Sequence, residues 1–220
     1  MNITIEGKPV FAHVIVELEP GETIVAESDA MSSMSAALDM KARLNGGFFG
    51  GLAKKFLGKE SLFINYFSNS TNQRLTLHLT QPTPGDIEIK ELHGDSYCLQ
   101  QGAYIASEPG IKLGLRWAGF GSLIGGEGLF KLVVSGHGKV IFGAYGGIIE
   151  KEINGEYIVD SGHLVAYGPE MKLKPQLAGG IFSSLFGGEG FVTRVEGKGK
   201  IYMQTRNLAG LASWINRHLA

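Results

Sequence analysis

Cysteine is almost absent from this sequence, because Cys98 is the only one among 220 residues. A single cysteine excludes an intrachain disulfide, and a reducing compartment is the expected environment. No uncharged apolar run reaches the roughly 18 residues that a membrane-spanning helix needs. The first residues, Met1 to Gly7, lack the basic and apolar regions of a secretory signal. We therefore expect a cytoplasmic protein, with peripheral membrane association left open.

An excess of charge of one sign is also missing. The chain has 20 basic and 21 acidic residues, and both kinds are spread along it. Without a basic field to hold a phosphate backbone, we expect no nucleic-acid binding. A net charge of −1 gives no other indication of the partner.

The usual sequence signatures of catalysis and metal binding are missing as well. There is no Gly-Lys-Ser/Thr phosphate loop, no Gly-x-Ser-x-Gly elbow, and no paired His or Cys ligands at zinc spacing. The 6 histidines are scattered, and we interpret His137 and His163 as solvated. Cys98 lies in an apolar stretch and is interpreted as a buried small hydrophobe. We expect no catalytic residues, no cofactor and no metal, and hence no enzyme.

Glycine is abundant, at 33 residues in a chain that is 44% hydrophobic. That combination is typical of short strands joined by tight turns. The alternating leucines of 75–79 and the β-branched run of 10–19 predict strands. The Met- and Ala-rich segment 28–44 fits a strand or a short helix, and the strand is favoured. The predicted fold class is all-β.

One short motif recurs along the chain at intervals of about sixty residues. Its copies are Leu-Ile-Gly-Gly-Glu-Gly-Leu-Phe at 123–130, Leu-Phe-Gly-Gly-Glu-Gly-Phe-Val at 185–192, and the degenerate Phe-Leu-Gly-Lys-Glu-Ser-Leu-Phe at 56–63. We predict three internal repeats of a β-sandwich unit (about 1–85, 86–146 and 147–208) with pseudo-threefold symmetry, forming a single domain over 1–220. A short amphipathic helix, 209–220, is expected to cover the barrel or a neighbouring subunit.

Other matched stretches give this repeat its expected internal frame. Asn154-Gly155 predicts a hairpin turn, as does the equivalent His93-Gly94-Asp95. The two Gly-x-Gly-Lys segments, 136–139 and 197–200, also predict turns between strands. In the first repeat, Pro20 to Ala26 is aligned with Gln101 to Ala106.

Apolar, glycine-rich segments are the main functional lead in the sequence. If their side chains are exposed, they form an apolar surface for a protein partner or a membrane. The alternative is that these apolar side chains are buried at the pseudo-threefold axis or against a sister subunit. The candidate interaction residues are Phe48, Phe49, Leu52, Phe56, Phe120, Leu123, Ile124, Phe182, Leu185 and Phe186. The motif acids Glu60, Glu127 and Glu189 are interpreted as structural, at a bulge or tight strand entry, in preference to a catalytic or metal-binding role.

The recurring Gly-Gly-Glu-Gly motif and the Gly-x-Gly segments that follow it resemble those of the altered-inheritance-of-mitochondria family of uncharacterised proteins, over nearly the whole chain. The resemblance implies a fold similar to the trp RNA-binding attenuation protein, with its unit triplicated. Fungal relatives are associated with the mitochondrial inner membrane. The resemblance implies no catalytic residues, and likeness of fold alone does not imply RNA binding.

The expected function is that of a non-enzymatic structural or interaction protein. We expect a homo-oligomer, with a trimer favoured, that offers an apolar face to a protein partner or a membrane surface. The alternative is a β-barrel that binds a small ligand or a metal, with enzymatic activity around Glu60, Glu127 and Glu189.

Overall fold

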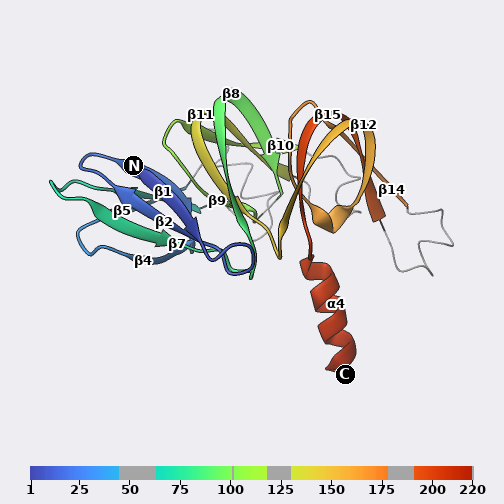
Figure 1. Cartoon of the computed structure of the whole chain (residues 1–220), viewed down its shortest axis with the longest axis horizontal. Helices are drawn as coiled ribbons and strands as arrows, with labels where there is room; N and C mark the ends of the chain where they lie inside the picture. The colour runs from blue at the N-terminus through green and yellow to red at the C-terminus, as the bar shows by residue number, and fades with distance from the viewer. Residues whose placement is uncertain (45–62, 101, 118–129, 178–190, 220) are drawn as a thin grey trace. The chain divides into compact units, whose positions relative to one another are not determined.

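The computed structural model describes residues 1–44, 63–100, 102–117, 130–177 and 191–219. These residues form mainly β-strands and one short C-terminal helix, α4, Leu208–His218 (Figure 1). The predicted all-β class and the C-terminal helix are therefore confirmed. The segment that was open between helix and strand, 28–44, contains two strands.

The strands follow one another along the chain from the N-terminus to the start of α4. They are β1 Asn2–Glu6, β2 His13–Leu18, β3 Thr23–Glu27, β4 Met31–Met34, β5 Asp39–Leu44, β6 Phe63–Ser68, β7 Leu75–Leu79, β8 Ile87–Leu99, β9 Tyr104–Ser107, β10 Ile111–Trp117, β11 Phe130–Gly143, β12 Ile148–Asp160, β13 Leu164–Tyr167, β14 Lys172–Leu177 and β15 Phe191–Gln204.

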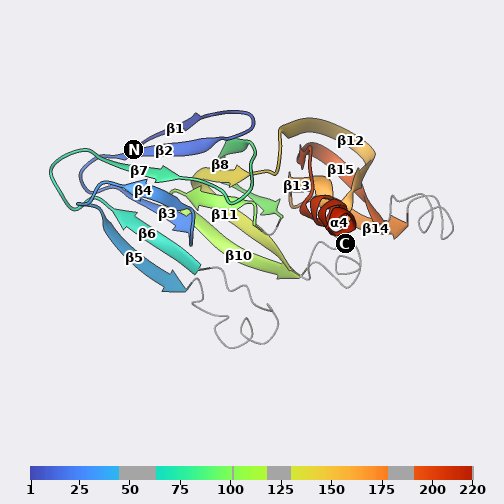
Figure 2. The same ribbon diagram turned by 90° about the horizontal axis from the view of Figure 1, so that it is seen from below.

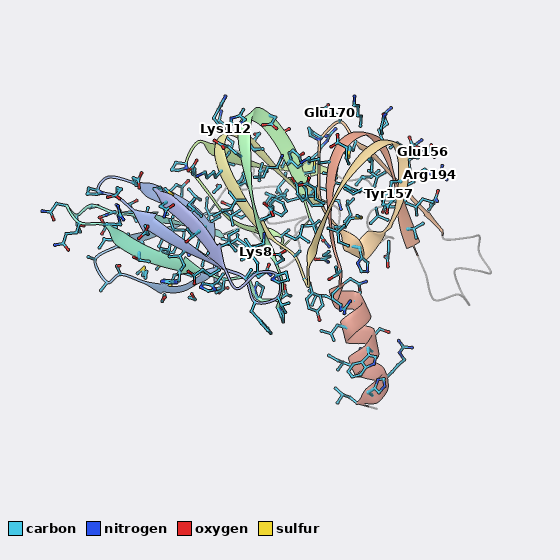
Figure 3. All side chains as sticks on the ribbon, in the orientation of Figure 1. Lys8, Lys112, Glu156, Tyr157, Glu170 and Arg194 are labelled. Carbon is cyan, nitrogen blue, oxygen red and sulfur yellow. The ribbon has the colours of Figure 1, made fainter. Side chains whose placement is uncertain are left out.

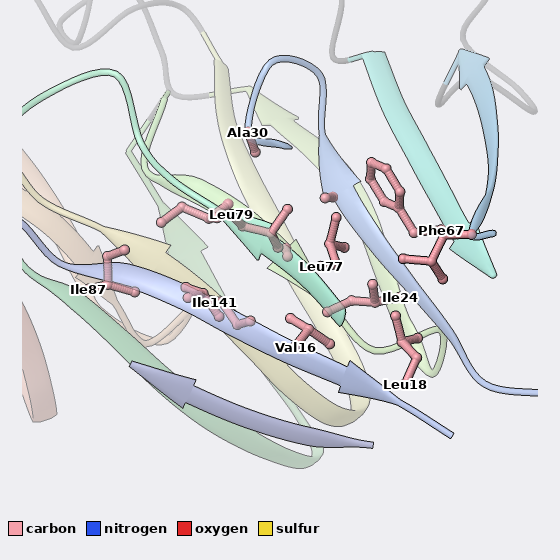
Figure 4. Packing of buried hydrophobic residues seen from close by; sticks show 14 of the residues in the cluster. Val16, Leu18, Ile24, Ala30, Phe67, Leu77, Leu79, Ile87 and Ile141 are labelled. Carbon is pink, nitrogen blue, oxygen red and sulfur yellow. The ribbon is translucent and has the colours of Figure 1, made fainter. Parts of the chain in front are cut away.

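The described chain forms two compact units, and the long strands β8 and β11 give residues to both. The first unit has a four-stranded sheet, ordered β1–β2–β7–β4, and a second sheet that runs β11–β9–β3–β6–β5. Buried side chains alternate along β2 and β7, as expected for strands with one buried face. Val16 and Leu77 from one sheet join Ile24 and Phe67 from the other in a single core (Figure 4). This unit is a β-sandwich.

The second unit is built around β15. Its strands are ordered β12–β15–β13–β8, and β14 also pairs with β15. Val195 and Ile201 of β15 are fully buried in the core of this unit. They pack in one cluster with Cys98, Ile153 and Val159.

The longest strands bend at glycine without ending. β12 pairs with β15 over its whole length, and Gly155 lies opposite Gly197 in that ladder. Both glycines have positive φ, +117° and +149°, which residues with a Cβ rarely adopt. The predicted turns at Asn154-Gly155, at His93–Asp95 and in the Gly-x-Gly-Lys segments are therefore wrong: these residues lie inside β12, β8, β11 and β15.

Three short strands pair with their neighbours in the same way. β4 on β7, β9 on β11 and β13 on β15 are all antiparallel, and each ladder has a register shift at the same place. The equivalent pairs are Ser33 with His78, Ala106 with Ile141, and Ala166 with Tyr202. The strand with the ladder of β9 and β13 is therefore β4. The alignment of Pro20–Ala26 with Gln101–Ala106 is wrong, because it equates β3 with β9, whereas β3 is a neighbour of β9 and its ladders have no such register shift.

Replacing Gly155 with alanine tests the bend in β12. A Cβ at Gly155 meets no atom within 4 Å, so the expected cost comes from its φ of +117° alone. We expect Gly155→Ala to lower the free energy of unfolding by about 1–2 kcal/mol in urea denaturation. Gly168→Ala is the matched control, because its Cβ is equally free of contacts and its φ is not in the positive range. Equal stability of the two variants would contradict this account of the bend.

Candidate functional site

The predicted interaction residues and motif acids all lie outside the described residues. They fall in the segments 45–62, 118–129 and 178–190. Each segment connects two paired strands: β5 with β6, β10 with β11, and β14 with β15. In two of these ladders the last paired residues flank the segment, namely Leu44 opposite Phe63 and Leu177 opposite Phe191. The three segments therefore occupy the same place in the strand order.

Within the described ranges, no cluster of three or more His, Cys, Asp or Glu side chains could hold a metal ion. Cys98 is buried, with 1% of its surface exposed, so its prediction as a small core hydrophobe is confirmed. Burial raises the pKa of the Cys98 thiol, which disfavours the thiolate needed for a nucleophile.

The feature of the described chain that most resembles a binding surface is α4. Its apolar residues recur at helical spacing: Leu208, Leu211, Trp214 and Ile215 form one stripe. No residue of α4 is buried, and Leu208 and Trp214 are 58% and 56% exposed. Figures 1 and 2 show α4 extending away from the end of β15 within the second unit. The expectation that the helix covers the barrel is therefore wrong for the described chain.

Hydrogen bonds at its first turn hold α4 in place. Asn207 is the N-cap, and its Oδ1 accepts a hydrogen bond from the backbone N–H of Gly210 at 2.5 Å. The Asn207 amide also donates to Nε2 of His163 at 2.9 Å. On the other side of the ring, Nδ1–H of His163 donates to the carbonyl of Gln204 at 2.6 Å. One neutral imidazole thus links the end of β15 to the start of α4.

This link was missed by the sequence reasoning, which placed His163 in solvent. The structure shows that its side chain is 28% exposed and bonded through both ring nitrogens. The available signal was Asn207, because an asparagine directly before an apolar stripe of helical spacing is a typical N-cap. Nothing in the sequence indicated that His163 would meet it from 44 residues away.

The charges on α4 are all basic. The helix contains no acidic residue, and Arg217 and His218 lie in its last turn, where cations interact favourably with the helix dipole. The ring of His218 stacks on Trp214 with 4.4 Å between ring centroids. Arg206 precedes the N-cap and is also exposed. The surface of α4 is therefore apolar on one side and cationic at its ends.

The face of β12 and β15, in contrast, carries charges that are already paired. Arg194 lies 2.6 Å from Glu156 (Figure 3). Lys200 lies 2.6 Å from Glu150. Such exposed pairs add little stability. In each pair one basic and one acidic side chain offset each other's charge.

The sequence and the fold have counterparts in known proteins. The mitochondrial biogenesis AIM24 family matches residues 3–206 of this chain. The chain belongs to this family. An uncharacterised protein of Streptococcus pyogenes serotype M6 is 28% identical over 228 residues, which cover 100% of this chain and 91% of the relative. A crystal structure of a Streptococcus pyogenes protein is similar with a TM-score of 0.79 and 26% identity, and the match covers 99% of each chain.

These relatives support the β-rich fold of the AIM24 chain over its full length, and neither carries an assigned function. Of the helices in the described ranges, none combines the length and apolar character that crossing a membrane requires.

The anchor of α4 in this AIM24 protein can be tested at Asn207. Asn207→Ala removes both the N-cap and the hydrogen bond to His163, and we expect it to destabilise the helix by about 1 kcal/mol. Helical signal in far-ultraviolet circular dichroism should fall. Asn207→Ser is the matched control, because serine retains an N-cap acceptor. If the alanine variant kept the full helical signal, the N-cap would not hold α4.

The environment of Cys98 gives a second test. Because burial raises the pKa of its thiol, we expect no reaction with a thiol-specific reagent at pH 8 in the native protein. Unfolding in guanidinium should expose the thiol and restore the ordinary rate, measured by absorbance. Rapid labelling of the native protein would show that this cysteine is accessible after all.

Proposed function

We propose that this AIM24-family protein is a non-enzymatic interaction protein that binds a lipid surface through the apolar stripe of α4. The observation that carries the proposal is that α4 exposes Leu208, Leu211 and Trp214 and buries none of its residues. An isolated helix of this length is only marginally stable in water, so α4 gains from a surface that covers its stripe.

The chemistry of α4 favours a lipid surface over a protein groove. Interfacial helices combine an apolar face with basic residues and aromatic side chains such as tryptophan. Trp214 lies on the apolar stripe, and Arg206, Arg217 and His218 flank it without any acid in the helix. The N-cap link to His163 fixes the start of α4 on β15, so the helix is presented from a rigid strand.

We also propose that the chain is three copies of one strand set. This rests on the shared ladders of β4, β9 and β13 and on the common place of the three connecting segments. Pseudo-threefold symmetry and a fold like the trp RNA-binding attenuation protein stay predictions. The predicted interaction residues Phe48, Phe49, Phe120 and Phe182 fall in the three connecting segments of this strand set.

The alternative function, a small-ligand or metal-binding barrel, is not favoured by any observation on the described residues. Their carboxylates are spread or paired with basic side chains, and they form no ligand cluster.

Vesicle flotation tests the proposal. We expect the protein to float with vesicles of phosphatidylcholine and phosphatidylglycerol, and Leu211→Ser with Trp214→Ser to reduce the bound fraction by at least about tenfold, because each side chain loses its burial in lipid. Asn216→Ser, on the polar side of α4, is the matched control. In a Trp117→Phe background, Trp214 emission should shift to the blue on binding.

Two results would contradict the proposal. One is equal flotation of the double variant and the control. The other is that the protein does not float with vesicles and that a second protein cross-links to it at Trp214. That result would assign the stripe to a protein partner.

A further inference from the structure

Two short strands in this chain are each paired on both edges. β9 lies between β11 and β3, and β13 lies between β15 and β8. Their second ladders have one register: Ser107 is opposite Val25, and Tyr167 is opposite Cys98. In both ladders the second neighbour belongs to the preceding strand set along the chain. Every residue of β9 and β13 is buried as a result.

β4 is the counterpart of β9 and β13, but its second edge is open. It pairs with β7 in the register that β9 has on β11, and it lies at the end of the four-stranded sheet. No second neighbour of β4 is present among the described residues. Ser32 and Ser33 are exposed accordingly, whereas their counterparts Ile105 and Ala106 in β9 are buried.

The end of β12 is the matching strand that lacks its neighbour. Ile158 is opposite Arg194 on β15, and Val25 is opposite Tyr66 on β6. Arg194 and Tyr66 each lie three residues after the start of their strand, so Ile158 corresponds to Val25. Cys98 is the third member of this set, because it is opposite Tyr167 as Val25 is opposite Ser107. β12 lies at the end of its sheet, and within the described ranges it pairs only with β15. The exposed fraction shows the difference: Val25 is 6% and Cys98 is 1% exposed, whereas Ile158 is 52% exposed.

The residues of the proposed contact carry few of the features that normally prevent strand addition. Edge strands are usually protected by lysine, proline or inward-pointing charges. β4 reads Met-Ser-Ser-Met, without a charge or a proline. In β12 the residues 157–159, Tyr-Ile-Val, are uncharged, and the acids Glu156 and Asp160 flank them. The register shift in β4 is no protection, since β9 and β13 have the same shift and still accept a second neighbour.

We propose that β12 of one copy of this chain pairs with β4 of a second copy. The pairing is antiparallel, with Met34 opposite Ile158 and Ser33 opposite Val159, in the register of the β9–β3 and β13–β8 ladders. A second copy is the occupant because β4 and β12 each lie at the end of a sheet, so the described residues of one chain leave both edges unpaired. The inference rests on the three-copy arrangement proposed above and is independent of α4.

The hydrogen bonding of the proposed ladder follows from the existing one. The backbone N–H of Gln100 donates to the carbonyl of Val165 at 2.7 Å where β8 meets β13. The corresponding bond joins the N–H of Asp160 to the carbonyl of Ser32 of the second copy. Each chain offers one β4 edge and one β12 edge, so the contact joins two different surfaces, head to tail. All edges are paired only when the copies close into a ring.

Disulfide trapping tests both the register and the partner. Residues directly opposite one another in antiparallel strands have Cα atoms about 4.5–5.5 Å apart, which a disulfide can span. In a Cys98→Val background, Met34→Cys protein mixed with Ile158→Cys protein should give a disulfide-linked dimer under mild oxidation. Either protein alone should stay monomeric on a non-reducing gel. Met40→Cys mixed with Ile149→Cys, two exposed positions outside the proposed ladder, is the collision control.

The cross-link also distinguishes a second copy from closure within one chain. A chain carrying both Met34→Cys and Ile158→Cys should form covalent oligomers. A cross-linked species of monomer mass, with no dimer from the mixed single variants, would overturn the proposal. Cross-linking no better than in the control mixture would overturn it as well.

A lysine introduced into the proposed ladder provides a second, non-covalent readout. Ile158→Lys places an unpaired charge between the two strands, and we expect the dissociation constant of the oligomer to rise by at least about tenfold. Ile149→Lys, at an exposed position on the same strand, is the matched control and should keep the native mass by light scattering. An oligomer unaffected by Ile158→Lys would contradict the proposal. Vesicle flotation of the same variants reports on α4 separately, so a failure of either proposal is distinguishable.

Discussion

Backbone pairing along the long bent strands is the constraint on which the rest of this structure depends. β15 pairs with β12 on one edge, and with β14 and β13 on the other, so one strand organises the second unit. It accommodates both neighbours because Gly197 and Gly199 have positive φ and let it bend while its ladder continues. β11 has the same glycine pair, at Gly136 and Gly138.

The strands β6 and β7 are joined by a different residue. Here the chain is divided into β6 and β7, and Asn69 lies between them, 1% exposed. Its side-chain amide donates to the carbonyls of Leu18 and Gln73, so a side chain satisfies backbone groups that the interrupted ladder leaves open. The division of this strand also separates the four-stranded sheet, and with it the open edge of β4.

Open strand edges and one exposed helix are the surfaces of the described chain on which the two proposals rest. Strand edges offer backbone donors and acceptors that suit another strand, whereas α4 offers an apolar stripe that suits a lipid surface. The two surfaces use different chemistry, so assembly and surface binding are separable properties. Neither requires a catalytic group, in agreement with the high burial of Cys98 and the paired charges of β12 and β15.

Much of the fold followed from local pattern, and the errors share one cause. Alternation in 75–79 indicated a half-buried strand correctly. The glycine content was interpreted as tight turns between short strands, whereas several of these glycines lie inside long strands. The Asn154-Gly155 signal was misread because a glycine with positive φ serves equally in a hairpin turn and in a bend of a continuous strand. The presence of Gly197 directly opposite decides between them, and that pairing is a tertiary contact. His163 was misplaced for the same reason.

The sequence by itself determined the all-β class, the C-terminal helix and the burial of Cys98, because these follow from local periodicity and from the apolar neighbours of each residue. Tertiary structure alone decided which strands are neighbours, that His163 meets Asn207, and which edges stay open. Hydrogen-bonded partners in a sheet are distant along the chain, and backbone groups carry no residue-specific signal, so the pairing of β4 and β12 edges is visible only in the folded protein.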